Sequence, residues 1–370
     1  MTETAVTAAH EREFPQIKGF DYVEFYVGNA QQAAHFYRTT FGFTPVAAIG
    51  LEVGVRDRVS VVIKRGSICF VLTSGLAPDG PVAEHVRVHG DSVKDIALAV
   101  VDAGRAFAMA IERGAREILP PTVFEDDDGR IIKATIATCG DNVHSFIQRE
   151  GYRGSFFPGY RALAHRPAGP TTGLNSIDHI AISVEPGKLG EVIGFYDQVM
   201  SLRQSHHEDI VTEYSGMNSK VVQNNNGSIK FPVMEPATGK RRSQIDEYLD
   251  FHHGPGVQHI ALATDDIFDT ARVLRENGIE FLSVPADYYE RLPERLGAIE
   301  DDIESLRSLS ILIDRDEWGQ LLQIFTKPMQ DRPTLFLEII QRKGAKGFGS
   351  GNIEALFEAV EREQAVRGNL

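Results

Sequence analysis

An internal repeat constrains this chain more than any other feature. Residues 89–100 read HGDSVKDIALAV, and residues 253–264 read HGPGVQHIALAT. In each copy an Asp and then a Gly follow the apolar run at matching spacing. An Asp at the start and a Gly at the end are common caps of a helix. A whole strand–helix unit is therefore duplicated, which must be recognised before any element is assigned.

Two more pairs extend the repeat. Residues 20–27 (FDYVEFYV) match residues 177–184 (IDHIAISV), and residues 144–149 (HSFIQR) match residues 337–342 (LEIIQR). The second half is longer, and most of its extra length falls in residues 284–314. That stretch is charged, and we expect it to be a partly helical insertion.

Each half reads as a strand, a helix and several further strands, twice over. We therefore expect an α+β fold with two similar domains, each of repeated βαβββ modules that form a curved sheet around a cavity, with helices outside. The Pro and Gly in residues 165–173 mark the boundary. The expected domains are residues 1–165, without a metal site, and residues 174–370, which hold the catalytic site.

Composition excludes several classes of partner. A net charge of -14 argues against nucleic acid, which needs clustered Lys and Arg. No apolar run reaches the roughly 18 residues of a membrane span, and residues 1–14 do not resemble a signal peptide. The two cysteines lie in apolar runs, which favours buried thiols over a disulfide. We expect a cytoplasmic homo-oligomer, a dimer or tetramer, without membrane or nucleic-acid partners.

The two halves differ at three positions that carry metal-ligand chemistry. The second half has His179, His259 and Glu338 on three strands. The first-half counterparts are Tyr22, Asp95 and Ser145. Two imidazoles and one carboxylate form the facial triad of non-haem iron(II) sites, which leaves neighbouring coordination positions open. Zinc also accepts two His and a carboxylate, so the donors alone do not choose the metal.

Strand alternation predicts how these ligands point. It puts each ligand on one face with the residue two positions earlier, namely Ile177, Val257 and Phe336. The ligands then converge in a mostly apolar pocket, which limits water around an oxidising centre. Four other histidines lie in polar, loop-like stretches and are expected at the surface: His206, His207, His252 and His253.

Around these residues the chain resembles the 4-hydroxyphenylpyruvate dioxygenase family and its close relative 4-hydroxymandelate synthase, which share vicinal-oxygen-chelate modules. The specific stretches are SQIDEYL (243–249), GVQHIAL (256–262), LLQIFTKPMQDRPTLFLEIIQR (321–342) and GFGSGN (347–352). The likeness runs from about residue 19 to residue 370. It implies that His179, His259 and Glu338 bind iron(II).

The resemblance also implies a substrate pocket. Three glutamine amides are implied to act in catalysis: Gln244, Gln258 and Gln323. The implied substrate-binding residues are Ser219, Pro232, Met234, Phe325, Phe336, Phe348, Asn352 and Ile353. The implied reaction combines an aromatic 2-oxo acid with dioxygen and releases carbon dioxide. Ring hydroxylation with side-chain migration then gives homogentisate, as in tyrosine catabolism, whereas benzylic hydroxylation gives 4-hydroxymandelate.

Two positions depart from the dioxygenase pattern. Met234 stands where the family usually has Asn, and Ile353 stands where it has a Phe near the substrate ring. The synthase resembles this chain there, whereas Pro232 and the KPMQDRP run resemble the dioxygenase. The sequence therefore predicts 4-hydroxyphenylpyruvate dioxygenase, with 4-hydroxymandelate synthase or a dioxygenase of another 2-oxo acid as alternatives. A non-catalytic binding protein is the alternative from a different class.

Two expectations concern the pocket wall. If Asn226 and Gly227 form a two-residue hairpin loop, Ser219 pairs with Met234 across the hairpin. Residues 354–367 read as an amphipathic helix that packs over the domain. By resemblance to the family, this helix could also close the pocket as a lid.

Overall fold

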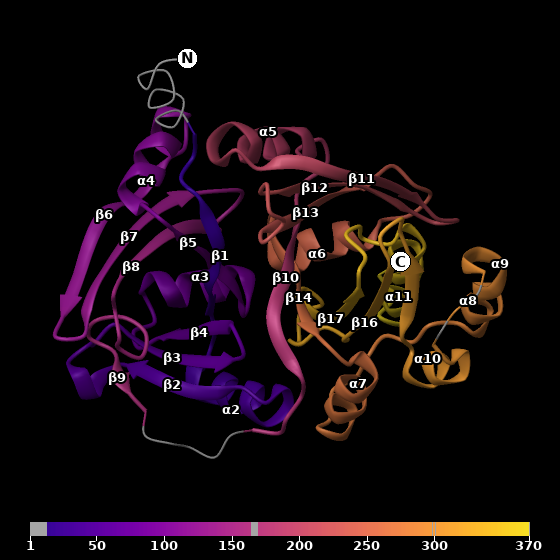
Figure 1. Cartoon of the computed structure of the whole chain (residues 1–370), viewed down its shortest axis with the longest axis horizontal. Coiled ribbons are helices and arrows are strands. Elements are labelled where there is room, and N and C mark those ends of the chain that lie inside the picture. Colours follow the sequence, from indigo (N-terminus) through magenta and orange to yellow (C-terminus); the bar gives the residue numbers. More distant parts are fainter. Residues whose placement is uncertain (1–12, 164–168, 298, 300, 370) are drawn as a thin grey trace.

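The computed structural model describes residues 13–163, 169–297, 299 and 301–369. Two curved mixed sheets lie side by side, each with helices packed against it (Figure 1). The first sheet contains β1 (Ile17–Tyr26), β2 (Thr44–Ile49), β3 (Arg58–Arg65), β4 (Ile68–Gly75), β5 (Ser92–Val100), β6 (Glu117–Asp126), β7 (Gly129–Ala137), β8 (Val143–Glu150) and β9 (Arg161–Ala162). Its helices are α2 (Ala30–Phe41), α3 (Pro81–His89), α4 (Ala103–Glu112) and the 3-10 turn Leu51–Val53.

The second sheet contains β10 (Leu174–Ser183), β11 (Arg203–Val211), β12 (Gly216–Gln223), β13 (Lys230–Ala237), β14 (Gly256–Thr264), β15 (Leu312–Arg315), β16 (Gln320–Phe325) and β17 (Phe336–Lys343). Its helices are α5 (Leu189–Met200), α6 (Gln244–His252), α7 (Ile267–Glu276), α8 (Ala286–Glu290), α9 (Leu292–Leu296), α10 (Ile303–Leu309) and α11 (Ser350–Val366).

The two sheets repeat one topology. The strand order is β6-β7-β8-β5-β1-β4-β3-β2-β9 in the first and β11-β12-β13-β10-β14-β17-β16-β15 in the second. In each sheet the opening strand, β1 or β10, pairs in parallel with one neighbour and antiparallel with the other. β5 and β14 then pair in parallel with β8 and β17. The predicted α+β fold with two similar halves is confirmed.

Helix caps follow the repeated sequence. Asp102 accepts a hydrogen bond from the Arg105 N–H at the start of α4, and Asp266 accepts one from the Asp269 N–H at the start of α7. These side chains satisfy amide groups that have no partner within the helix. The predicted insertion is also present, as α8, α9 and α10 at the outer edge of the second half (Figure 1).

The register of the β12–β13 hairpin is as predicted, but its loop is longer. Ser219 pairs with Met234, and the last pair is Gln223 with Lys230. The Asn224 side chain accepts a hydrogen bond from the Ile229 N–H at 3.1 Å, so a wider loop replaces the two-residue turn. The loop adds residues symmetrically on both strands, which leaves the register unchanged.

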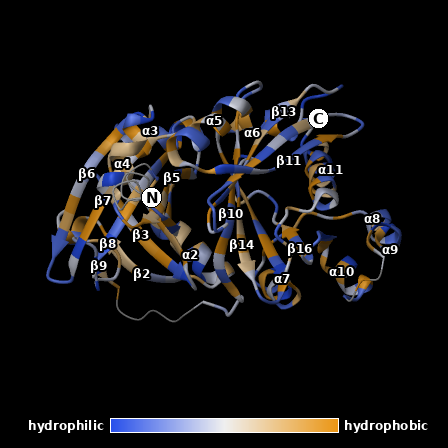
Figure 2. Ribbon diagram, turned by 45° about the horizontal axis from the view of Figure 1, so that its top comes forward, coloured by the Kyte–Doolittle hydropathy of each residue, from blue (hydrophilic) through white to orange (hydrophobic). Residues whose placement is uncertain are grey.

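One apolar core runs through both halves. Tyr196 of α5 stacks on Phe231, and its hydroxyl lies 3.1 Å from Nε2 of His144 in the first half. Figure 2 shows hydrophobic residues concentrated along the strands of both sheets. Within the described residues, no helix is long and apolar enough to cross a membrane. The start of the predicted boundary, residues 165–168, lies outside the described residues; β9 precedes it and β10 follows it.

Candidate metal centre and substrate pocket

Three adjacent strands of the second sheet bring the predicted ligands together. His179 lies on β10, His259 on β14 and Glu338 on β17. Nε2 of His179 is 3.2 Å from Oε2 of Glu338, and Nε2 of His259 is 3.7 Å from the same oxygen. One ligand atom from each side chain lies within 4.8 Å of the other two, and all three residues are buried. This arrangement can hold one metal ion.

Two β-bulges orient the imidazoles. Asp178 is the extra residue between Ile177 and His179 on β10, and Gln258 is the extra residue before His259 on β14. A bulge lets two consecutive side chains reach the same side of a sheet. Oδ1 of Asp178 therefore accepts from Nδ1 of His179 at 2.9 Å, and Oε1 of Gln258 accepts from Nδ1 of His259 at 3.1 Å. When both imidazoles are neutral, their Nε2 atoms carry lone pairs toward Glu338. Although burial acts in the opposite direction, the neighbouring Glu338 and Asp178 raise the pKa of His179.

The bulges also correct the predicted faces. Ile177 and Val257 pack in the main core together with Ile180 and Ile260, and they do not share the face of the ligands. The prediction was wrong there because strict alternation fails across an inserted residue. It succeeds on β17, where the Phe336 ring stacks on His259 with centroids 4.9 Å apart.

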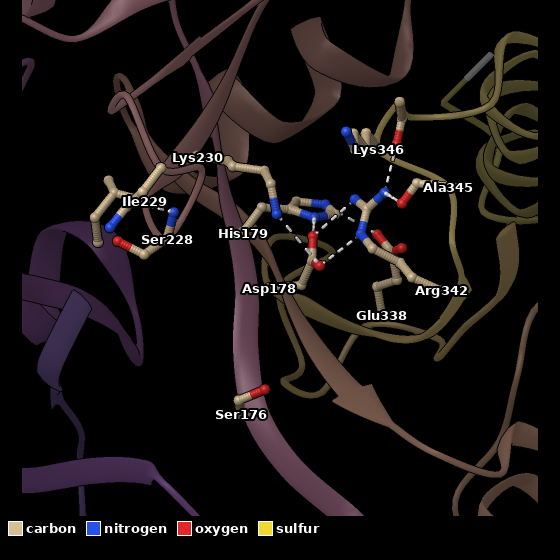
Figure 3. Close-up of polar contacts among 12 residues, drawn as sticks. Ser176, Asp178, His179, Ser228, Ile229, Lys230, Glu338, Arg342, Ala345 and Lys346 are labelled. Atoms are coloured by element: carbon tan, nitrogen blue, oxygen red, sulfur yellow. Dashed lines mark hydrogen bonds and ion pairs between the residues drawn. The ribbon is translucent and has the colours of Figure 1, made fainter. Parts of the chain in front are cut away.

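An ion cluster supports His179 from behind. Arg342 donates to both carboxylate oxygens of Asp178, at 2.7 and 2.9 Å. The Nζ atom of Lys230 lies 3.5 Å from Oδ2 of the same carboxylate (Figure 3). Although burial acts in the opposite direction, the hydrogen bonds from His179 and Arg342 hold the pKa of Asp178 well below its usual value. Burial, with the neighbouring His179, lowers the pKa of His259 well below its usual value. A neutral imidazole is the form that binds a metal.

A hydrogen-bond chain fixes the carboxylate. Nε2 of Gln323 donates to Oε1 of Glu338 at 2.8 Å, and Oε1 of Gln323 accepts from Asn352 at 2.8 Å. This series of hydrogen bonds continues into the insertion. There the Tyr288 hydroxyl is 2.8 Å from Oδ1 of Asn352 and accepts a hydrogen bond from Arg295 at 3.1 Å. Oε2 of Glu338 is left to face the two imidazoles.

Aromatic rings line the space around the ligands. Phe325 lies edge-on to His259 at 6.5 Å, and Phe348 lies edge-on to His179 at 5.2 Å. Together with Phe336 they surround the triad with flat apolar surfaces. Such walls suit an aromatic substrate.

The remaining predicted pocket residues fall into three groups. Met234 of β13 and Ile353 of α11 share one apolar cluster with Phe357, so the two positions that depart from the dioxygenase pattern lie together between the sheet and α11. Gln244 is 3.5 Å from Gln258, and both border a small cavity of about 20 Å³ that Phe336 also lines. Ser219 and Pro232 are buried on β12 and β13, but Ser219 donates to the Glu208 carbonyl at 3.1 Å and to no ligand residue.

α11 covers this pocket. Its buried residues include Asn352, Phe357 and Glu361, and Glu361 accepts from Thr212 at 2.9 Å. It packs against β15, α6 and β11. The helix therefore packs over the second half of the chain, and its role as a lid stays a prediction.

One surface prediction was wrong. His252 is buried, and its ring lies between Tyr248 and His89, stacked on each. His206 is half-buried, 6.0 Å from the Phe348 ring, while His207 and His253 are exposed. The polar local sequence hid this burial because the covering residues come from the first half of the chain.

The first half fills the equivalent place with an ion pair. Asp95 accepts hydrogen bonds from Tyr22 at 3.0 Å and from Ser145 at 2.6 Å, and Lys133 pairs with it at 3.1 Å. Tyr22, Asp95 and Ser145 are the three counterparts of the ligands. The Lys133 ammonium lies where a cation would stand among them.

Sequence reasoning missed Asp178, Arg342, Lys230 and Tyr288. The repeat contained a signal for the first two, because Asp21 and Arg149 form the same bidentate pair in the first half, at 2.7 and 2.9 Å. Tyr288 carries no such signal because it lies in the insertion.

The repeated sheets and the buried triad define a metal-binding enzyme of the vicinal-oxygen-chelate class. The model of the "Glyoxalase/Bleomycin resistance protein/Dioxygenase superfamily" matches residues 176–301. The model "Hydroxyphenylpyruvate dioxygenase, HPPD, N-terminal" matches residues 13–157.

Relatives define the family more closely. The chain is 45% identical to the 4-hydroxyphenylpyruvate dioxygenase of Yarrowia lipolytica, covering 95% of this chain and 94% of that protein. It is 45% identical to that of Danio rerio, covering 95% and 92%. A solved mutant of 4-hydroxymandelate synthase from Streptomyces coelicolor is 38% identical, with a TM-score of 0.86, covering 95% and 100%. The chain belongs to the 4-hydroxyphenylpyruvate dioxygenase family, whose members are metal-dependent dioxygenases.

Proposed function

We propose that this protein converts 4-hydroxyphenylpyruvate and dioxygen to homogentisate and carbon dioxide, a step of tyrosine catabolism, with iron(II) held by His179, His259 and Glu338. The observation that carries the proposal is the buried triad, in which each ligand side chain is oriented by a hydrogen bond to a neighbouring side chain. The names of relatives that match nearly the whole chain support the substrate.

The donor set fits iron(II). Two neutral imidazoles and one carboxylate are a donor set that would hold iron(II) and leave coordination positions free for substrate and dioxygen. Orienting partners on both His ligands and on Glu338 are what a metal site needs for a fixed geometry. Bound there, iron(II) supplies open coordination positions and electrons for the reaction of dioxygen with the 2-oxo acid.

The protein's own residues place the substrate and exclude water. Phe325, Phe336 and Phe348 give the aromatic ring flat apolar contacts close to the triad. The amide of Gln258 contacts the His259 ring, and the amide of Gln244 lies 3.5 Å from that of Gln258, so both would donate to and accept from the phenol or the 2-oxo acid. α11 closes over the pocket, so the chemistry takes place away from bulk water.

4-Hydroxymandelate synthesis is the second candidate function. Met234 of β13 and Ile353 of α11 lie in one cluster, where an aliphatic wall replaces the polar and aromatic groups of the dioxygenase pattern. The 38% identity to a synthase mutant, at a TM-score of 0.86, supports this alternative too. Product analysis after aerobic incubation of the iron(II)-loaded protein with 4-hydroxyphenylpyruvate separates the two.

We also propose a division of labour between the halves. Residues 174–370 would carry the catalytic site and α11 as its lid, while residues 1–165 would be a scaffold in which Lys133 and Asp95 replace a metal centre. The protein would act in a reducing cytoplasm as a homo-oligomer. Free thiols support a reducing compartment: burial raises the pKa of Cys69 and of Cys139 to about 12, which keeps both thiols protonated and inert.

Replacing single ligands tests the proposal. His179→Ala, His259→Ala and Glu338→Ala should each abolish iron-dependent oxygen uptake, because each removes one of three protein ligands. Tyr22→Phe and Asp95→Asn are the controls, and they should leave the iron content unchanged. Retained turnover in Glu338→Ala would contradict the triad, and iron lost from the controls would mean that the wrong half was assigned.

A further inference from the structure

A second cluster of metal-ligand side chains lies in the first half, away from the triad. His85 and His89 lie four residues apart on one face of α3, and Asp141 lies in the turn between β7 and β8. One ligand atom from each of the three lies within 4.8 Å of the other two. Two histidines spaced by four on a helix present their rings side by side, a common arrangement for binding zinc.

The contacts of His89 indicate where its proton is. Its Nδ1 lies 2.6 Å from the main-chain carbonyl oxygen of His252, so Nδ1 carries a proton and donates it. Its Nε2 lies 2.9 Å from Oδ2 of Asp141. In a neutral His89, the Nε2 lone pair therefore faces a carboxylate oxygen. Two acceptors at this distance need a positive centre between or beside them.

His179 makes the same set of contacts. Its Nδ1 is held by Asp178, and its Nε2 faces Glu338 at 3.2 Å. A histidine that binds a metal usually donates its other N–H to a carboxylate or a backbone carbonyl, which fixes the ring. Nδ1 of His89 donates to a backbone carbonyl, and Nδ1 of His179 donates to a carboxylate.

His85 is held in a complementary way. Its Nε2 lies 2.9 Å from the Ser92 hydroxyl, and that hydroxyl donates to the Gly90 carbonyl at 3.3 Å. The hydroxyl oxygen can then accept from Nε2–H of His85, which leaves the lone pair on Nδ1. Lys94 donates to the main-chain carbonyl of Asp141 and so anchors the turn, while the carboxylate remains turned toward His89.

We propose that His85, His89 and Asp141 bind a second divalent metal ion, of the zinc(II) type. Two imidazoles and one carboxylate suit tetrahedral zinc, and the solvent-exposed side of Asp141 leaves the fourth position to water. Because His89 donates to His252 on α6, this ion stabilises the contact between the two halves. The site does not depend on the proposed iron centre.

The alternative is an ion pair without a metal, in which a doubly protonated His89 donates to both His252 and Asp141. The ion pair and the metal-free form of a zinc site have the same contacts, but only the zinc site binds Zn²⁺. Metal stoichiometry of the full-length protein therefore separates them.

The experiment removes metals with a chelator, dialyses the protein against Zn²⁺ at neutral pH, and measures bound zinc per chain. Wild type should bind two equivalents, Asp141→Asn one, Glu338→Gln one, and the double variant none. His89→Gln should behave as Asp141→Asn, since its amide can still donate to His252 but is a poor ligand. Asp79→Asn, at an exposed site, is the matched control and should keep both equivalents.

Competition with a metal-binding dye then gives the affinity. Asp141→Asn should weaken one site by more than about tenfold, because loss of a residue that only orients a ligand already costs about 10–100-fold. A single equivalent in wild type, lost only in Glu338→Gln, would overturn the second site and leave the triad standing. A second equivalent that survives both Asp141→Asn and His89→Gln would overturn it as well. Zinc bound at the triad shows that Asp141→Asn and His89→Gln are folded, and circular dichroism checks Glu338→Gln and the double variant.

Discussion

At the scale of single residues, the side chains beside the ligands determine how the ligand rings and the carboxylate are oriented. Asp178 and Gln258 occupy bulge positions, and each holds Nδ1 of the histidine that follows it. Gln323 performs the corresponding task for Glu338 from the neighbouring strand. These contacts lock the ring and carboxylate orientations before a metal binds, which reduces the cost of ordering them.

Gln323→Leu tests the support of the carboxylate. The variant keeps the approximate volume but removes the amide that donates to Glu338 and accepts from Asn352. We expect iron(II) affinity to fall by about 10–100-fold, measured by competition with a chelator. Gln320→Leu on the same strand is the control; an equal loss there would show a general effect on β16.

Met234 and Ile353 allow a test of product choice. A ring-stacking aromatic contributes roughly 0.5–1.5 kcal/mol, and about 1.4 kcal/mol changes a product ratio tenfold. We expect wild type to make mainly homogentisate with a detectable benzylic by-product, because Pro232, Phe325 and Phe348 keep the dioxygenase pattern. Ile353→Phe, alone or with Met234→Asn, should raise the homogentisate fraction.

Chromatography at equal oxygen consumption measures that fraction. Mostly 4-hydroxymandelate from wild type would establish the synthase instead. Oxygen uptake driven only by a different 2-oxo acid would mean that the two positions mark another substrate.

At the scale of elements, the insertion and α11 form one unit with the metal centre. The Tyr288 hydroxyl on α8 contacts Asn352 of α11, and it also bonds the Ile313 main chain at 2.9 Å. Asn352 leads through Gln323 to Glu338. Within the insertion, α8 thus contacts α11 and, through Asn352 and Gln323, a predicted metal ligand.

Tyr288→Phe tests this link, with an adjacent residue as the control. Removing the hydroxyl leaves buried partners unsatisfied, so the free energy of unfolding should fall by about 1–3 kcal/mol, and α11 should become more sensitive to protease. Tyr289 is equally buried, but its hydroxyl has no hydrogen-bond partner in the described part of the chain. Tyr289→Phe should therefore be neutral or stabilising, and equal effects of the two changes would contradict the link.

Asp316 anchors the segment before α11 and has a pH-dependent effect. Its carboxylate accepts four main-chain N–H bonds, from Trp318 and Gly319 at one oxygen and from Lys346 and Gly347 at the other. Although burial opposes them, these bonds together lower its pKa. Asp316→Asn should cost about 1–3 kcal/mol at pH 7 because an amide nitrogen cannot accept.

The sign of the pH dependence follows from the lowered pKa. The stabilisation by Asp316 is complete above the unfolded-state pKa of about 3.9 and is lost as the pH falls through the lower folded-state pKa. Denaturant midpoints of wild type and Asp316→Asn should therefore converge below about pH 4. A constant gap down to pH 2 would contradict this.

At the scale of the whole molecule, the two halves carry different side chains at equivalent positions of the same sheet topology. The second half gathers three metal ligands, and the first half replaces them with the buried network of Lys133 and Asp95. Both halves keep the bulge Asp and its Arg partner, as Asp21–Arg149 and Asp178–Arg342. The first half therefore keeps the scaffold of a metal site without its donors.

Lys133→Met tests this replacement. It leaves the Asp95 charge buried and unpaired, which should reduce the free energy of unfolding by about 3–5 kcal/mol. Adding Asp95→Asn to the same chain should recover most of the loss, because no charge is then buried. Denaturant unfolding measures both, and a double variant no more stable than Lys133→Met would show that the ion pair is not the reason.

The sequence by itself determined those features that a comparison of the two halves reveals. Aligned halves indicated two similar α+β domains, the three ligand positions and the β12–β13 register, because these depend on local pattern and on comparison within the chain. What only the tertiary structure decided are the contacts made by inserted residues and by residues from the other half. Bulges at Asp178 and Gln258 break the alternation that a pattern assumes, and His252 is buried by α3, far away in sequence. Tyr288 reaches Glu338 through two other side chains. Such partnerships depend on where folded elements meet, and no periodicity in one segment records that.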